Sequence, residues 1–138
     1  MEAAEALADL TEISTQIETA VLVDAHGTVV ASTFASPASA EATARAAREL
    51  LAAAERAMGG GEGRERLVQL QAASPDGCVF LVQDEERIVA AITEPEPTVG
   101  LVFYDLKTCL RHVAGEDLTP KPKARAGSLQ AEEGDREG

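Results

Sequence analysis

Two cysteines and two histidines are the side chains of this sequence best suited to bind a metal ion or to act as nucleophiles. Cys109 and His112 lie three residues apart, so on a helix they share one face, and thiolate and imidazole are both zinc ligands. Cys78 and Asp105 are the only candidates to complete such a set. A buried cysteine beside a surface histidine is far commoner than a zinc site, so we expect no metal here.

Phosphate and acyl-transfer motifs are missing from the chain. There is no Gly-x-x-x-x-Gly-Lys-Ser/Thr loop, and the glycine cluster at 59–63 lacks the lysine. There is no Gly-x-Ser-x-Gly motif either, and His26 falls in a predicted turn. We therefore expect neither an enzyme nor a bound cofactor, and we interpret residues 59–65 as a mobile loop.

Three arginines share one predicted helix: Arg45, Arg48 and Arg56. Such a group could reach a nucleotide held by a partner protein, as an arginine finger does. However, Glu41 and Glu49 lie four residues on either side of Arg45, which favours ion pairs within the helix. We expect the second role.

Charge and composition exclude several classes of partner. The formal net charge is -12, which argues against nucleic acid and anionic membrane surfaces because both are polyanions. The first five residues are acidic where a signal peptide is basic, and no apolar stretch approaches the roughly 20 residues of a membrane span. Two cysteines far apart do not make a disulfide scaffold. We expect a cytoplasmic protein without membrane insertion.

The periodicity of apolar residues predicts the element order α-β-β-α-β-β-β-α. The predicted helices cover 3–18, 37–58 and 99–114, and the predicted strands cover 20–24, 28–33, 67–72, 78–82 and 87–92. A tight turn with Gly27 at positive φ joins the first two strands, and the last three form an antiparallel meander. Strand 78–82 is apolar at every position, so helices should cover both faces of the sheet.

The fold class that follows is α/β (α+β), a three-layer sandwich around a five-stranded antiparallel sheet. Two helices should lie on one face and one helix on the other. Residues 1–114 form the single expected domain. The tail 115–138 is rich in Pro, Lys, Gly, Glu and Asp and has almost nothing to bury, so we predict disorder there.

The helix over 37–58 carries more apolar surface than its own sheet needs. Its charges fall in one arc of roughly 120°, which leaves an apolar arc of roughly 200°, nearly twice the usual stripe. One side of that arc should face the sheet: Ala40, Ala44, Ala47, Leu51 and Met58. The other side consists mostly of small residues that allow a second helix to approach closely: Ala42, Ala46, Leu50, Ala53 and Ala57.

This second side predicts a two-fold dimer. The strand over 67–72 supports it, because a sheet edge without Lys or Pro invites pairing with another chain. The predicted interface adds Leu67, Gln69 and Gln71 to the five helix residues. The alternative is that alanine is simply a good helix former and the second side stays exposed.

The element order and three segments resemble the roadblock/dynein-light-chain family. The segments are Ala20–Ser32, the strand pair Cys78–Ile92 and the start of the last helix at Thr98–Lys107. The resemblance covers about 3–114. It implies a homodimer with one continuous sheet and paired central helices, and a Ras-like small GTPase as the partner that it regulates or scaffolds, as in bacterial MglB-like members. It implies no catalytic motif.

A second interpretation also follows from the predicted layers. Three-layer domains of this kind are similar to PAS and profilin-like modules, some of which sense small molecules. Small residues such as Ala72, Ala90 and Ala91 could leave a cavity against the sheet. The scarcity of aromatic and buried polar groups to hold a ligand makes this the alternative function.

Overall fold

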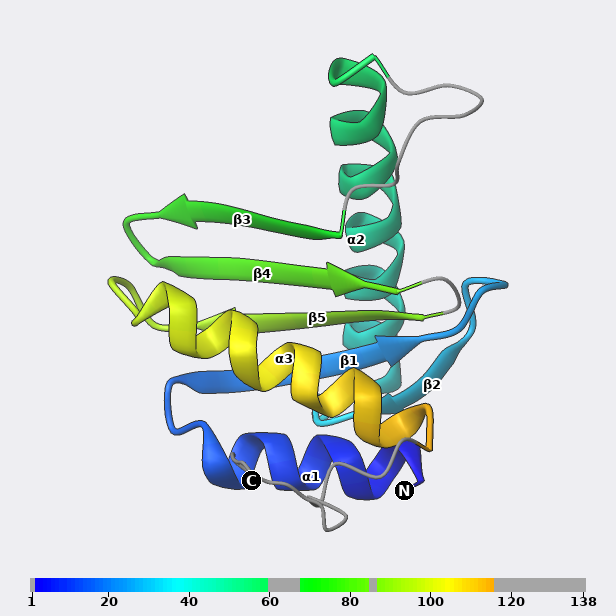
Figure 1. Ribbon diagram of the computed structural model, residues 1–138, viewed down its shortest axis with the longest axis vertical. Coiled ribbons are helices and arrows are strands. Elements are labelled where there is room, and N and C mark those ends of the chain that lie inside the picture. Colours follow the sequence, from blue (N-terminus) through cyan, green and yellow to red (C-terminus); the bar gives the residue numbers. More distant parts are fainter. Residues whose placement is uncertain (1, 60–67, 85–86, 116–138) are drawn as a thin grey trace, which may run out of the picture.

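The computed structural model describes residues 2–59, 68–84 and 87–115. Its helices are α1 (Ala3–Ile13), α2 (Pro37–Ala57) and α3 (Val99–Val113), and its strands are β1 (Ile17–Val23), β2 (Val29–Ser32), β3 (Gln69–Ser74), β4 (Gly77–Gln83) and β5 (Ile88–Thr93) (Figure 1). The order of elements is the one predicted from the sequence. No described helix has the length and apolar character that crossing a membrane requires.

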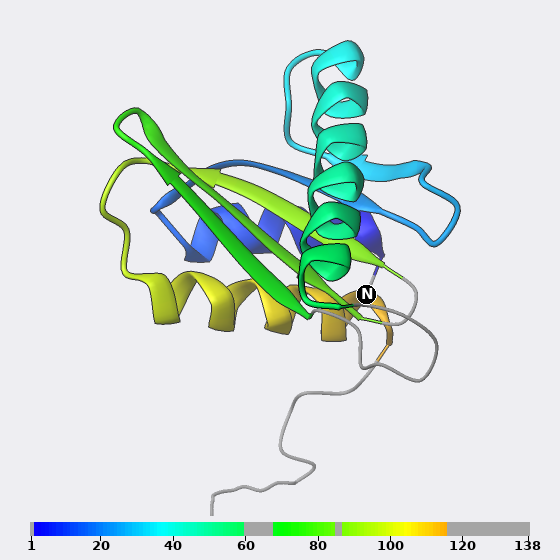
Figure 2. The same ribbon diagram turned by 90° about the horizontal axis from the view of Figure 1, so that it is seen from above.

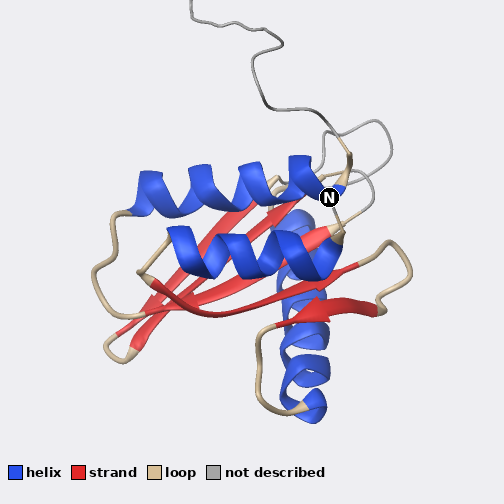
Figure 3. Cartoon of the chain, turned by 90° about the horizontal axis from the view of Figure 1, so that it is seen from below, coloured by secondary structure: helices blue, strands red, loops and turns tan. Residues whose placement is uncertain are grey.

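The five strands form one antiparallel sheet in the order β2-β1-β5-β4-β3. Helices α1 and α3 lie side by side on one face, and α2 crosses the other (Figures 2 and 3). The fold is therefore the three-layer α+β sandwich that the sequence predicts. Strands β2 and β3 are the two edges of the sheet, and β3, β4 and β5 form the predicted meander.

Two apolar cores lie on the two faces of the sheet, because its central strands are apolar at successive positions. Leu22 and Phe80 point to the α1–α3 side, where the Phe80 and Phe103 rings meet edge to face with centroids 5.0 Å apart. Val21 and Leu81 point to the α2 side. This alternation confirms that both faces of the sheet are covered.

The first helix is shorter than predicted. It ends at Ile13 instead of continuing to residue 18, and Ile17 is the first residue of β1. Ile17 pairs with Thr93 of β5, and the Gln16 Oε1 accepts a hydrogen bond from the Thr98 backbone N–H at 2.6 Å. Pairing with β5 and this contact at the start of α3 hold the chain in a turn where the apolar spacing suggested more helix.

The second helix begins as predicted at Pro37 and ends at Ala57, one residue earlier than predicted. The Ser36 Oγ caps its N-terminus by accepting hydrogen bonds from the N–H groups of Ala38 (3.1 Å) and Ser39 (3.3 Å), and Pro37 occupies the first turn. Gly59 follows the helix with a φ of 75°. The predicted mobile loop at 59–65 falls almost wholly outside the described residues, as does the predicted disordered tail after Gly115.

Two hairpins show how polar side chains fix the turns. In the first, the Asp24 carboxylate accepts hydrogen bonds from the N–H groups of His26 (2.9 Å) and Thr28 (3.0 Å), and Gly27 has the expected positive φ of 86°. In the second, β3 ends at Ser74, two residues later than predicted, and the Ser74 Oγ accepts from the Asp76 N–H. The turn is therefore shorter than the sequence suggested.

Candidate interaction surface

The outward side of α2 carries the five helix residues predicted to meet a partner, and all five are exposed: Ala42, Ala46, Leu50, Ala53 and Ala57. We call this set the α2 outer face. Leu50 is its largest member, with 39% of its surface exposed. The inward side is buried as expected through Ala40, Ala44, Ala47 and Leu51. The helix therefore presents more apolar surface than its own sheet covers.

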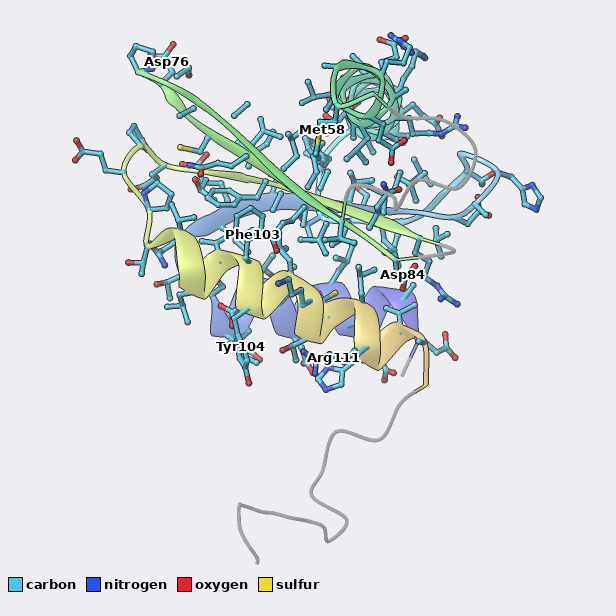
Figure 4. All side chains as sticks on the ribbon, turned by 45° about the horizontal axis from the view of Figure 1, so that its top comes forward. Met58, Asp76, Asp84, Phe103, Tyr104 and Arg111 are labelled. Carbon is cyan, nitrogen blue, oxygen red and sulfur yellow. The ribbon has the colours of Figure 1, made fainter. Side chains whose placement is uncertain are left out.

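Met58 is the one wrong assignment on this helix. It was expected to face the sheet, but it lies at the C-cap of α2 with 67% of its surface exposed. The C-terminal end of α2 extends beyond β3 in Figure 1, and Met58 stands at that end in Figure 4. Because the helix leaves the sheet before Met58, this side chain adds to the exposed apolar surface.

The edge strand β3 is the second part of the surface. It pairs only with β4, so its outer row of backbone groups has no strand beside it among the described residues. Gln71 is exposed and Gln69 is half-buried, while Leu67, the third predicted strand residue, lies outside the described residues. No Lys or Pro protects the described part of the edge, which is the arrangement that favours pairing with another chain.

An apolar shelf lies between these two parts. Leu70 is opposite Leu81 and Ala72 is opposite Val79, and both pairs point to the α2 side of the sheet. Helix α2 packs chiefly on β1, β2 and β5, so Leu70 and Val79 are only partly buried and Ala72 is exposed. The shelf (Leu70, Ala72 and Val79) therefore continues the α2 outer face across to the edge of the sheet.

Two side chains of α2, Glu55 and Arg48, contact other elements of the fold. Near its C-terminus the Gln83 Nε2, itself buried, donates a hydrogen bond of 3.0 Å to the Glu55 Oε2. Nearer its middle the Arg48 guanidinium packs over Gly27, where even a methyl group would collide with it. Arg48 thus lies against the hairpin turn, and all three arginines, Arg45, Arg48 and Arg56, are exposed on the helix.

Both cysteines among the candidate metal ligands are buried. Cys109 is buried between α1 and α3, where burial, with a smaller contribution from Asp9, raises the pKa of its thiol to about 11. Such a thiol is neutral at physiological pH and is a poor nucleophile. Cys78 is also buried, and His26 is exposed on the first hairpin turn. Within the described residues, no three His, Cys, Asp or Glu side chains are placed to hold a metal ion.

A groove that was not predicted from the sequence lies on the α3 side of the sheet, near its β3 edge. It has a volume of about 280 Å³ and runs between the end of β4 and the C-terminal half of α3. Lys107 and Arg111 border it, one helical turn apart. The spacing of these two basic residues in an acidic chain could have indicated a binding surface on α3. The sequence of α3 alone, however, does not show that β4 forms the opposite wall of the groove.

Solved structures of the same fold come from several sources. A roadblock/LC7 domain from Streptomyces avermitilis aligns with a TM-score of 0.73 and 18% identity over 83% of this chain and 97% of that one. The gliding protein MglB from Thermus thermophilus aligns with a TM-score of 0.65 and 16% identity over 82% and 86%. Profilin IA from Acanthamoeba castellanii gives 0.52 and 15% over 81% and 97%. These low identities establish the fold alone.

Sequence comparison is more specific. Among curated proteins, none matches the chain. The family model of the Roadblock/LC7 domain matches residues 3–94, from the start of α1 to the residue after β5. The match covers more than half of the chain and ends before α3. Together with the sheet order and the helix layers described above, it shows that the chain belongs to the Roadblock/LC7 family.

Proposed function

We propose that this protein is a non-catalytic homodimeric adaptor that binds a Ras-like small GTPase and either modulates its GTPase cycle or holds it in a signalling complex. The observation that carries the dimer is the continuous apolar surface of the α2 outer face, the shelf and the unpaired edge of β3. The proposal of a GTPase partner rests on membership of the Roadblock/LC7 family and on the MglB-like fold.

A two-fold axis beside β3 would use all parts of this surface together. Antiparallel pairing of β3 with its copy satisfies the exposed backbone groups, and it joins the two sheets. The same operation brings the second α2 toward the first, where alanines at 42, 46 and 53 permit close contact between helices. The partner helix would also cover the shelf, which the protein's own α2 leaves exposed.

The decisive residue for this dimer is Leu50, so the first experiment is the solution mass by light scattering. We expect a dimer for the wild type and a monomer for Leu50→Glu, because a carboxylate in the centre of an apolar helix interface cannot be solvated. The matched control is Leu101→Glu on α3, where the leucine is 49% exposed on the opposite face of the molecule. This variant should stay dimeric. A monomeric wild type would refute the dimer.

The GTPase is tested separately. Ras-like GTPases of the same organism, each loaded with GDP or with a non-hydrolysable GTP analogue, are titrated against the wild type and Leu50→Glu. We expect one of them to bind the wild-type dimer in a nucleotide-dependent manner and to bind the variant more weakly. If none of them distinguishes its nucleotide states in binding, the proposed partner is wrong.

The alternative, a small-molecule sensor, depends on a cavity near three alanines. Ala90 and Ala91 are fully buried in the two cores, one on each side of the sheet, and Ala72 is exposed on the shelf. None of these positions provides a specific observation in favour of a ligand.

A further inference from the structure

The groove beside α3 combines an apolar floor with a basic rim. Val82 of β4 and Leu110 of α3 form the floor, and Val68, 55% exposed, closes one end of it. Lys107 and Arg111 stand on the rim, on the side of α3 that faces the edge of the sheet. Arg111 is labelled near the C-terminal end of α3 in Figure 4. An occupant of this groove would need an apolar side chain next to negative charge.

The local charge differs from the charge of the whole chain, which is -12. One carboxylate, that of Asp84, also lines the groove, but its Oδ1 accepts a 2.7 Å hydrogen bond from the Arg87 backbone N–H in the β4–β5 turn. Among the described residues that line the groove, two cations and one engaged carboxylate leave a net positive charge. A short acidic segment is therefore the complementary ligand.

The chain itself leaves α3 at this groove. Ala114, the C-cap of α3, lines it, and Gly115 has a φ of 85° while its N–H donates to the His112 carbonyl at 3.1 Å. A glycine in this conformation ends the helix and turns the chain away from the helix axis. The next three residues in the sequence are Glu116, Asp117 and Leu118, two acids and one apolar side chain.

The distances permit this segment to reach the groove. Three extended residues span about 10 Å, and the seven-residue step from Lys107 to Ala114 along the helix is also about 10 Å. Because the segment is tethered at the rim, its effective concentration is in the millimolar range, so even weak contacts hold it. Another molecule of the same composition would lack this advantage.

We propose that residues 116–118 occupy this groove of their own chain, with Leu118 on the apolar floor and the carboxylates of Glu116 and Asp117 beside Lys107 and Arg111. The segment anchors the start of the C-terminal tail next to the β3 edge. This inference does not depend on the GTPase, and its test also works on a monomeric variant.

The chain has no tryptophan, so one introduced tryptophan reports on its own surroundings. In the full-length protein, Leu118→Trp should emit at shorter wavelength and be quenched more slowly by acrylamide than Leu129→Trp, a matched leucine farther along the tail. Adding Lys107→Glu and Arg111→Glu to Leu118→Trp should shift its emission to that of Leu129→Trp. Adding Lys121→Glu and Lys123→Glu instead, which change the net charge by the same amount without altering Lys107 or Arg111, should leave the emission as it was.

Two results would overturn the inference. The first is equal emission and quenching of Leu118→Trp and Leu129→Trp, or an emission of Leu118→Trp that ignores the charge reversal on α3. The second is a protected Leu118→Trp whose protection disappears on dilution or in the Leu50→Glu background, because the occupant would then come from a second copy. Protection that persists in that background supports the intramolecular contact and stands whether or not the dimer does.

Discussion

Single side chains decide which parts of this molecule are structural and which are free for binding. The arginines of α2 illustrate this, because the Arg48 guanidinium lies against the turn at Gly27. Cys109, the best candidate ligand in the sequence, is a buried neutral thiol between two helices. Residue types alone suggested chemistry at both positions, but their neighbours come from other elements, and only the fold shows them.

Cys109 should make stability fall at alkaline pH. Its folded-state pKa is raised from 9.0 to about 11, so the folded protein holds this proton where the unfolded chain releases it. The contribution is fully present below about pH 9 and is lost as pH rises toward about 11, at about 1.4 kcal/mol per unit. Urea unfolding at both ends of this range should show a larger loss for the wild type than for Cys109→Ala. Equal losses would contradict the buried thiol.

Ser36 should contribute measurably through its cap. Removing the hydroxyl in Ser36→Ala leaves the N–H groups of Ala38 and Ser39 without their acceptor and should cost about 0.5–2 kcal/mol of unfolding free energy. Ser39→Ala, in the same turn and exposed, is the control and should change little. Denaturant titration of the two variants measures the difference, and equal stability would show that the cap is not formed in solution.

At the scale of elements, the sequence predicted the kind and order of every helix and strand, the two-plus-one helix layers and the edge position of β3. It failed where tertiary pairing competes with local periodicity. Leu7, Leu10 and Ile17 fit one helix face, yet Ile17 pairs with Thr93 in the sheet. Ser14 takes the buried place at the end of α1, and Ile13 is exposed. The groove at α3 was not predicted because its floor is formed by residues of two elements, β4 and α3, that are far apart in the sequence.

Two isoleucines test this difference between periodicity and structure. Ile17 is 5% exposed and Ile13 is 71% exposed. Ile17→Ala should therefore destabilise the protein by about 2–5 kcal/mol, while Ile13→Ala should stay within about 0.5 kcal/mol of the wild type. Thermal and urea unfolding of the two variants make the comparison. A helix continuing to residue 18 would instead make both substitutions costly.

At the scale of the whole molecule, surface left uncovered by one chain predicts assembly. The α2 outer face, the shelf and the open edge of β3 lie on the same side of the domain, opposite the layer formed by α1 and α3 (Figures 1 and 2). Exposed Leu50 and Met58 belong to this side. The dimer was predicted from the wheel of one helix, and the shelf was not, because it depends on how far α2 reaches across the sheet.

A dimer held by this surface should unfold in a concentration-dependent way. Mass action stabilises an associating protein as its concentration rises, so the thermal midpoint of the wild type should increase with concentration. The thermal midpoint of Leu50→Glu should not depend on protein concentration, whereas that of Leu101→Glu should rise with concentration as in the wild type. Differential scanning calorimetry over a hundredfold range of concentration provides the measurement. A constant wild-type midpoint would contradict assembly through this surface.

The central position of β1 and β5 also has a consequence for biosynthesis. Strands β1 and β5 pair in the middle of the sheet, with Ile17 opposite Thr93, although they lie near opposite ends of the segment that the family model matches. As the chain leaves the ribosome, β1, β2 and α2 can associate early, but β1 keeps an open edge until β5 has been made. Contacts this distant in sequence slow folding, and an exposed apolar strand edge is prone to aggregation. We expect nascent chains that stop before β5 to depend on chaperones.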